Sequence, residues 1–229
     1  MVDNKAPRKS VAMQTLTQDL YRRVREDILA GRLRPGQRLK IDEIRAQSGV
    51  GLNVAREAFS RLTGEGLLRS VPQHGFFVMD LSSVDHLHLT EARAAVESIG
   101  LQWAVERGDL AWEGQVLAAH HVLESTPIVP AGGDGRFSQK WVEAHTAFHS
   151  ALVAGCGNDR LLGVIASLRD SAELYRRWSQ PYQPGGGRDL RAEHATLARL
   201  TVARNSTAAI EQLTRHLQPS PGTLHSDTQ

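Results

Sequence analysis

Closely spaced glycines between residues 31 and 75 constrain this chain most, because they divide it into segments long enough only for brief helices and strands. An apolar stripe of helical period begins near Thr15 and stops at Gly31, and Gly49 separates two shorter helical patterns. After Gly66 the pattern becomes that of a β-hairpin. We expect helices over about 15–30, 41–47 and 52–63, and strands over about 67–71 and 76–78. This order is typical of a winged helix-turn-helix.

From residue 81 onward every periodic segment has a helical pattern. The expected helices cover about 83–107, 110–125, 136–155, 159–180, 187–204 and 206–218. Residues 1–14 and 219–229 are polar, and we expect them to be disordered tails. The sequence therefore predicts a mainly α protein, with a winged helix-turn-helix over 15–80 and an all-α bundle of about six helices over 81–218.

Charge is distributed unevenly between the two halves. Residues 1–80 contain 14 Lys and Arg and 9 Asp and Glu, a net charge of +5. Residues 81–229 contain 13 Lys and Arg and 16 Asp and Glu, a net charge of −3. We expect only the first half to contact a polyanion such as DNA.

The sequence has few features of a membrane or secreted protein. No stretch approaches the roughly 18 apolar residues of a membrane-spanning helix, and the N-terminus lacks the apolar segment of a secretory signal. Cys156 is the single cysteine, so an internal disulfide is excluded. These observations predict a cytoplasmic protein without a membrane partner.

Residues 20–78 resemble the DNA-binding domain of the GntR family of bacterial regulators. The resemblance is carried by separate blocks in the right order, namely ILAGRLRPGQRL, VAREAFSRLTGEGLL and HGFFV. It implies that the helix over about 52–63 is a recognition helix that enters the major groove of DNA.

Two polar side chains of this helix are candidates for reading bases. Asn53 can bridge an adenine edge, and Arg56 can bridge a guanine edge or bind a phosphate. The alternative for Arg56 is an ion pair with Glu57 or Glu26. Many relatives carry arginine where this chain has Leu52, so the resemblance does not transfer an operator sequence.

The remaining DNA candidates lie around the recognition helix. Arg45 and Arg61 are placed for contacts to the DNA backbone. Gln73 and His74 are expected at the tip of the wing, where they can enter the minor groove, and Gly75 lets the backbone approach closely. The family resemblance places functional residues at Arg56, His74 and Gly75.

Residues 81–218 resemble the FCD ligand-binding domain of the FadR branch of the same family. The segments that carry this resemblance are EARAAVESIGLQWA, AHTAFHSALVAGCGNDRLL and RAEHATLARLTVARNSTAAIEQLTRHL. Within that branch the chain looks closest to the CsiR-type repressors, which respond to a short dicarboxylate. The resemblance implies a small carboxylate effector and a homodimer.

Four histidines of this half form a candidate metal site. His145 and His149 are four residues apart and share a helix face, and His194 and His216 lie on the last two helices. Four imidazoles could hold a divalent ion, Zn or Ni. The resemblance implies ligands at His149, His194 and His216, whereas His145 stands where metal-binding relatives usually have Asp. The alternative is a set of hydrogen-bonded core histidines without metal.

Two arginines are candidates for holding the effector. Arg93 lies four residues before Glu97, so it could form an intrahelical ion pair, or it could bind a ligand carboxylate through two hydrogen bonds. The resemblance favours effector binding. Arg169 is a further candidate.

The leading hypothesis is a ligand-responsive transcription regulator, a repressor released from its operator by a small carboxylate. One alternative is a metal-dependent enzyme built on the histidine cluster, although the sequence lacks an HExxH motif, a phosphate-binding glycine loop and a nucleophile elbow. A second alternative is a scaffold that does not bind DNA.

Overall fold

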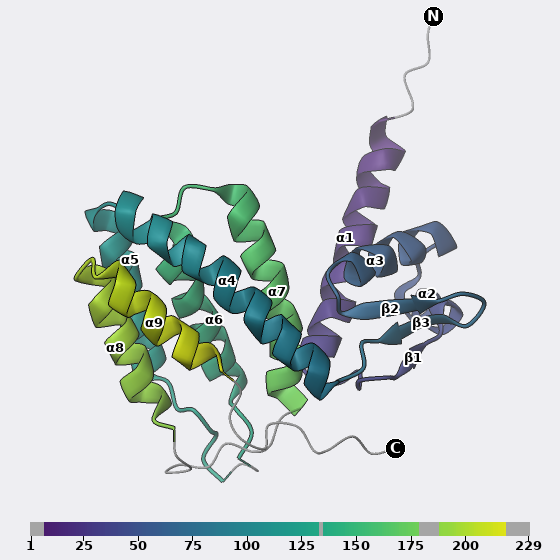
Figure 1. The fold of residues 1–229 in the computed structure, drawn as a ribbon. Coiled ribbons are helices and arrows are strands. Elements are labelled where there is room, and N and C mark those ends of the chain that lie inside the picture. Colours follow the sequence, from purple (N-terminus) through teal and green to yellow (C-terminus); the bar gives the residue numbers. More distant parts are fainter. Residues whose placement is uncertain (1–6, 133–134, 179–187, 219–229) are drawn as a thin grey trace, which may run out of the picture. The chain divides into compact units, whose positions relative to one another are not determined.

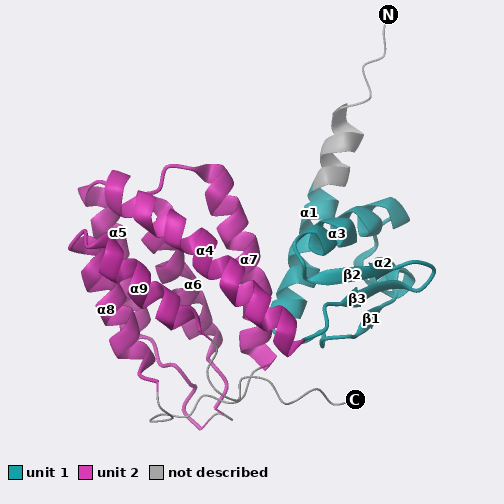
Figure 2. Ribbon diagram, viewed as in Figure 1, with its two compact units in different colours: residues 1–81 teal, residues 82–229 magenta. Residues whose placement is uncertain are grey.

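The computed structural model describes residues 7–132, 135–178 and 188–218, with side chains from residue 15 onward. The chain divides into two compact units, residues 1–81 and 82–229 (Figure 2). The division falls one residue after the predicted boundary at residue 80. We describe each unit by itself.

The described residues of unit 1 form three helices and a three-stranded antiparallel sheet (Figure 1). The strands lie in the order β1-β3-β2, and β2 and β3 form a hairpin in which Leu68 pairs with Val78 and Val71 pairs with Gly75. The bounds of the elements are α1 Pro7–Leu29, β1 Arg38–Leu39, α2 Ile41–Ser48, α3 Leu52–Gly64, β2 Leu68–Val71 and β3 Gly75–Val78.

The apolar face of α3 forms the centre of unit 1. This face is buried and consists of residues at helical spacing, namely Val54, Ala55, Ala58, Phe59 and Leu62. The α1 stripe of Leu20, Val24 and Ile28 is buried in the same unit, and α1 packs against α3. Helix α2 ends and the chain turns toward α3 because Gly49 adopts φ 65°, a left-handed conformation that glycine tolerates best. Packing of α1 and α2 on the inner face of α3 leaves its other face exposed.

Two features of unit 1 differ from the sequence prediction. We predicted a tail over residues 1–14, but α1 begins at Pro7, so the prediction was wrong for residues 7–14. Proline is favoured at a first helical position, and most of the residues that follow it are good helix formers, so the helix extends beyond its packed part. The strand β1 was missed because its two residues are held by pairing with Phe77 and Phe76 of β3, which no local pattern reveals. Residues 1–6 lie outside the described residues.

Every regular element in the described residues of unit 2 is a helix, as predicted. Helix α4 packs against α6, α7 and α9, and α5 packs against α6 and α8. The buried core includes Trp112, Phe148, Leu152, Leu197 and Leu213. The bounds of the elements are α4 Ser83–Arg107, α5 Leu110–Ser125, α6 Gln139–Ala154, α7 Asp159–Trp178, α8 Leu190–Val202 and α9 Ser206–Leu217.

Side-chain caps set where several of these helices begin. The hydroxyl oxygen of Ser138 accepts from the N–H of Trp141, so α6 begins at Gln139 rather than at the predicted residue 136. The carboxylate of Asp189 accepts from the N–H of Ala192 and starts α8 at Leu190, and Arg188 before it is not helical. The predicted end of the helix over 159–180, the predicted start at 187 and the tail over 219–229 lie outside the described residues.

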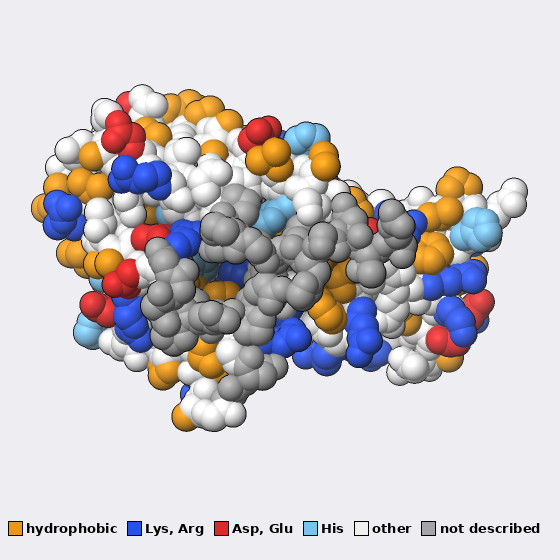
Figure 3. Space-filling model, turned by 60° about the horizontal axis from the view of Figure 1, so that its bottom comes forward, with side chains coloured by type: hydrophobic (Ala, Val, Ile, Leu, Met, Phe, Trp, Pro, Cys, Tyr) orange, Lys and Arg blue, Asp and Glu red, His pale blue; other side chains and the backbone are white. Residues whose placement is uncertain are grey.

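The described helices include none that combines the length and the apolar character needed to cross a membrane. On the face drawn in Figure 3, hydrophobic and charged side chains are intermingled.

Candidate functional site

The outer face of α3 presents two of the predicted DNA-contacting residues. Asn53 and Arg56 are both exposed. Within the part of the chain that the structure describes, Arg56 makes no hydrogen bond or ion pair, so neither Glu57 nor Glu26 holds its guanidinium. Glu57 instead accepts from Arg61 at 2.7 Å. The guanidinium of Arg56 is therefore available to a partner molecule.

Arg61 is also exposed and Arg45 is half-buried, and both have partners. Arg61 donates to Glu57 and, at 3.2 Å, to the side-chain oxygen of Gln18. Arg45 lies 3.3 Å from Asp42 in the same helix. Exposed ion pairs of this kind contribute little to stability, about 0–1 kcal/mol, so they can be exchanged for other anionic partners.

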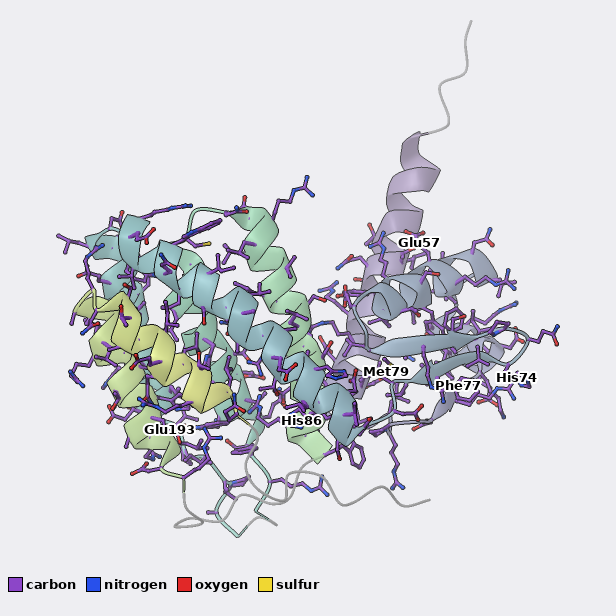
Figure 4. All side chains as sticks on the ribbon, viewed as in Figure 1. Glu57, His74, Phe77, Met79, His86 and Glu193 are labelled. Carbon is purple, nitrogen blue, oxygen red and sulfur yellow. The ribbon has the colours of Figure 1, made fainter. Side chains whose placement is uncertain are left out.

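The tip of the β2–β3 wing brings Gln73, His74 and Gly75 together in an exposed turn. The N–H of His74 donates to the carbonyl oxygen of Val71 at 3.0 Å, and His74 lies at the end of the hairpin, away from the helices of its unit (Figure 4). Gln73 has φ 64°, a left-handed conformation that glycine or asparagine usually supplies after a turn proline. The wing therefore holds a polar side chain in a strained backbone position, which is more frequent at binding sites than elsewhere.

The four predicted histidines come together inside unit 2. His145 and His149 project from α6, His194 from α8 and His216 from α9, and one nitrogen of each lies within 4.8 Å of the others. His149, His194 and His216 are buried. The centres of the rings of His145 and His149 are 4.4 Å apart, and those of His194 and His216 are 4.6 Å apart. Residues 71 positions apart in the sequence thus form one cluster of imidazoles.

Several nitrogens of this histidine cluster are buried without a partner. Both ring nitrogens of His149 and Nε2 of His194 have no hydrogen bond within the described residues. Buried polar atoms are nearly always satisfied, so this arrangement is uncommon for an ordinary core. Hydrogen-bonded core histidines would need partners that His149 lacks. A divalent cation fits the donor set, because neutral imidazole nitrogens are ligands that Zn and Ni accept.

The electrostatic environment keeps these imidazoles neutral. Burial lowers the pKa of His145 and of His149 well below 6.5, and neighbouring histidines and arginines lower both further. Burial also lowers the pKa of His194 to about 2. The pKa of His216 is lowered by burial too, although Glu193 opposes the shift. Neutral rings keep the lone pairs that a metal needs.

One residue in contact with the histidine cluster that sequence reasoning missed is Glu193, which directly precedes His194. Its carboxylate accepts from Nδ1 of His216 at 2.8 Å and from Arg188. Burial raises the pKa of Glu193, but the hydrogen bonds from His216 and Arg188 outweigh burial and lower the pKa to about 2. Nothing in the local sequence pattern indicates a contact between α8 and α9 at these two residues.

The two predicted effector-binding arginines share one buried carboxylate. Glu97 of α4 is fully buried and accepts from Nε of Arg93 at 3.0 Å and from Arg169 of α7 at 2.6 and 2.9 Å. The intrahelical ion pair considered for Arg93 is therefore present. Burial raises the pKa of Glu97, but the two arginines reverse this and hold it below its usual value. Two guanidinium groups face a single carboxylate, which leaves an excess of positive charge.

An aromatic stack lies beside this charged group. The rings of Phe137, Trp141 and His145 are stacked in sequence, with 4.7 Å between the centres of successive rings. The guanidinium of Arg176 lies 5.4 Å from the centre of the Trp141 ring. Burial and the nearby Arg93 lower the pKa of Arg176 to about 9. The interior of unit 2 thus combines neutral metal-type ligands with cationic groups, a combination suited to an anionic ligand.

Known families match both units. Residues 16–78 match the family described as bacterial regulatory proteins, gntR family, and residues 88–219 match the FCD domain. The repressor GlaR of Escherichia coli strain K12 is 33% identical over 202 residues, which cover 87% of this chain and 91% of GlaR.

Solved structures share the fold. A GntR transcriptional regulator from Rhodococcus sp. RHA1 has a TM-score of 0.69 and 26% identity, covering 88% of this chain and 93% of that one. McbR of Escherichia coli also has a TM-score of 0.69, at 18% identity, with coverage of 88% and 93%. The closer resemblance to CsiR-type repressors is not tested by these matches and stays a prediction.

The relatives also bear on the enzyme alternative. They are transcription regulators, so they give no support to a metal-dependent enzyme. With matches over both units and a relative at 33% identity along most of its length, the chain belongs to the GntR family of bacterial transcription regulators, and its winged helix-turn-helix is followed by an FCD domain.

Proposed function

We propose that this regulator is a cytoplasmic repressor whose affinity for its operator falls when a small carboxylate binds in the FCD domain. The observation that carries the proposal is the match to GlaR, a transcriptional repressor, over both units. A probable repressor of a D-xylose utilization operon is also 33% identical, over 139 residues. The guanidinium groups of Arg93 and Arg169, held in the interior of unit 2 by one carboxylate, support an anionic effector.

The DNA-binding surface in this proposal consists of the exposed face of α3, the α2 arginine and the wing. Arg56 reads a guanine edge, and support comes from its exposure and lack of an internal partner. Asn53 beside it reads an adenine edge. The other contacts are to phosphates from Arg45 and Arg61, and to the minor groove from Gln73, His74 and Gly75.

The metal site in this proposal consists of His145, His149, His194 and His216, with Zn or Ni as the ion. Support comes from the mutual distance of their nitrogens and from the unpartnered buried nitrogens of His149 and His194. When bound, the ion would supply a positive centre that attracts an effector carboxylate. Its role is binding rather than catalysis.

The effector site in this proposal adds Arg93 and Arg169 to the histidine cluster. An incoming carboxylate competes with Glu97 for their guanidinium groups, which can bind carboxylates through two parallel hydrogen bonds. Because α4 and α7 each supply one arginine, a change in this network alters how the two helices pack. A two-state change in this packing would be the means by which effector binding biases DNA binding.

The regulator acts as a homodimer in this proposal, because operators with two half-sites match two-fold proteins. Exposed apolar side chains on unit 2, including Leu87 and Ile99 of α4 and Val164 of α7, support a partner surface there. Sedimentation or light scattering measures the oligomeric state.

The function is tested by selecting bound fragments from genomic DNA with purified full-length protein. A gel-shift titration of the selected fragment, repeated with a panel of small mono- and dicarboxylates, should show specific binding that at least one carboxylate weakens. If the protein binds no fragment more tightly than random duplex DNA, sequence-specific DNA binding is contradicted. Specific binding that no carboxylate changes would contradict effector control.

A further inference from the structure

One histidine of the cluster forms a hydrogen bond with a carboxylate. Among the four histidines of the cluster, all of which the structure describes, His216 alone has a ring nitrogen hydrogen-bonded to an acidic side chain. The distance between its Nδ1 and Oε2 of Glu193 is 2.8 Å. The side chain of His216 is 7% exposed and that of Glu193 is 22% exposed, so solvent screens this contact little. His149, by contrast, has no hydrogen bond at either ring nitrogen within the described chain.

The hydrogen bond selects one form of the His216 ring. An ionised carboxylate can only accept, so Nδ1 must carry the proton. The lone pair of the neutral ring then lies on Nε2, which becomes the nitrogen available for coordination. When one ring N–H donates a hydrogen bond to a carboxylate, the opposite nitrogen becomes more basic and binds a metal more strongly.

Glu193 is itself held in place by Arg188. Nε of Arg188 donates to Oε1 of Glu193 at 2.9 Å, and Nη2 donates to Oε2 at 2.5 Å, a two-point pairing. The same guanidinium donates to the backbone carbonyl oxygens of His216 at 2.8 Å and Gln218 at 2.9 Å. Glu193 lies where the beginning of α8 meets the end of α9 (Figure 4). The carboxylate therefore has a fixed position relative to the ring it contacts.

We propose that Glu193 is a positioning residue of the histidine cluster, which orients His216, fixes its tautomer and strengthens Nε2 as a ligand for a divalent cation. The inference rests on the metal site of the proposed function. Helix α8 thus has two roles, because it supplies His194 as a ligand and, one residue earlier, the support for a ligand on α9.

The chain offers a matched control in the same unit. Glu113 of α5 is 19% exposed and pairs with Arg204, whose guanidinium also donates to the backbone carbonyl oxygens of Val105 and Gly108. This arrangement resembles that of Glu193 and Arg188, but Glu113 makes no hydrogen bond to a histidine. Glu113→Ala therefore removes a comparable ion pair without changing the cluster.

The experiment measures the affinity of the full-length protein for Zn²⁺ alone, by competition with a chromophoric chelator. Loss of a carboxylate that supports a metal-bound histidine typically weakens binding about 10- to 100-fold, and we expect this for Glu193→Ala. Glu113→Ala should bind Zn²⁺ within about threefold of the unchanged protein. Glu193→Gln keeps an oxygen that can accept from Nδ1 but lacks the charge, so we expect a smaller loss.

A second readout does not depend on Zn²⁺. The side-chain ¹H–¹⁵N spectrum of the metal-free protein should show the His216 ring protonated at Nδ1, and Glu193→Ala should shift this ring toward the other tautomer. A purely structural role for Glu193 would lower stability without changing the tautomer. If Glu193→Ala fails to fold, the test passes to Glu193→Gln, which must weaken Zn²⁺ binding more than Glu113→Ala does.

The outcomes separate the inference from the function on which it rests. Equal Zn²⁺ affinity in Glu193→Ala and the unchanged protein, or equal weakening in Glu113→Ala, would overturn the positioning role and leave the metal site in place. Failure of the unchanged protein to bind Zn²⁺ would overturn the metal site itself, and the positioning role with it.

Discussion

Arg169 on α7 donates two hydrogen bonds, at 2.9 and 2.6 Å, to a single carboxylate oxygen of Glu97 on α4, although 72 residues separate them in the sequence. The side chain of Glu97 is fully buried and that of Arg169 is 11% exposed. Arg93 shares the same carboxylate from one turn earlier on α4. The contact therefore joins two neighbouring helices of unit 2 through a buried ion network, which should matter both for stability and for ligand response.

Replacing Glu97 by alanine should destabilise the protein strongly. The change leaves two poorly exposed guanidinium groups, those of Arg93 and Arg169, without their shared counter-charge. Breaking a buried ion pair on one side typically costs about 3–5 kcal/mol. Urea denaturation of Glu97→Ala and of the exposed-pair control Asp42→Ala should show a large loss of unfolding free energy for the first and a change under about 1 kcal/mol for the second. Similar values for the two variants would contradict a structural role for the network.

The same network should make stability depend on pH in the acid range. The pKa of Glu97 is lower in the folded protein than its ordinary value of 4.5, because Arg93 and Arg169 stabilise the charged form more than burial destabilises it. A lowered folded-state pKa gives stability that is present above 4.5 and is lost as the pH falls toward the folded-state value. The urea concentration at the unfolding midpoint should therefore fall less steeply between pH 7 and pH 3 in Glu97→Gln than in the unchanged protein. The same dependence on pH in both proteins would be evidence against a lowered pKa of Glu97.

Arg56→Ala should weaken operator binding without loss of fold. A bidentate contact to a base is worth about 1–3 kcal/mol, or roughly 5- to 150-fold in affinity. Since Arg56 has no partner within the described residues, its removal should leave the unfolding free energy within about 0.5 kcal/mol. Gel-shift titration and thermal unfolding measure the two effects. Arg61→Ala is the control, because it should weaken specific and random DNA alike.

Operator binding should also weaken steeply with salt. Each phosphate neutralised contributes about −0.9 to the slope of log affinity against log salt concentration. If Arg45 and Arg61 contact phosphates in both halves of a dimer, the slope should be several units, and Arg45→Ala should make it shallower by about two, one for each subunit. A slope near zero would point to a scaffold rather than a DNA-binding regulator.

Metal removal should lower the stability of unit 2. A ligand that binds only the folded chain stabilises it, so addition of Zn²⁺ to chelator-treated protein should raise its melting temperature. The double variant His149→Ala, His194→Ala removes the histidines whose buried nitrogens lack partners, and it should show no such increase. Elemental analysis of the unchanged protein should give one ion per chain. A protein that contains no metal and gains no stability from Zn²⁺ or Ni²⁺ would leave Arg93 and Arg169 as the effector anchors.

The local sequence pattern determined most of the helical framework. The buried face of α3 follows directly from apolar residues at three- and four-residue spacing. Helices α4 and α5 begin at the predicted residues because Ser82 and Asp109 cap their N-termini. The pairing of His145 with His149 also follows from spacing on one helix. Periodicity and capping act over a few residues, so these features can be read from the chain itself.

The tertiary structure alone decided which distant groups meet. The two-residue strand β1 exists only because β3 lies beside it, and it is packing that buries both ring nitrogens of His149 without a hydrogen-bond partner among the described residues. Glu97 contacts Arg169, and Glu193 contacts His216, because helix packing brings together side chains from separate elements. A hydrogen bond or ion pair depends on distance in space rather than in sequence, and burial, which makes such contacts strong and shifts their pKa values, is a property of the packed protein.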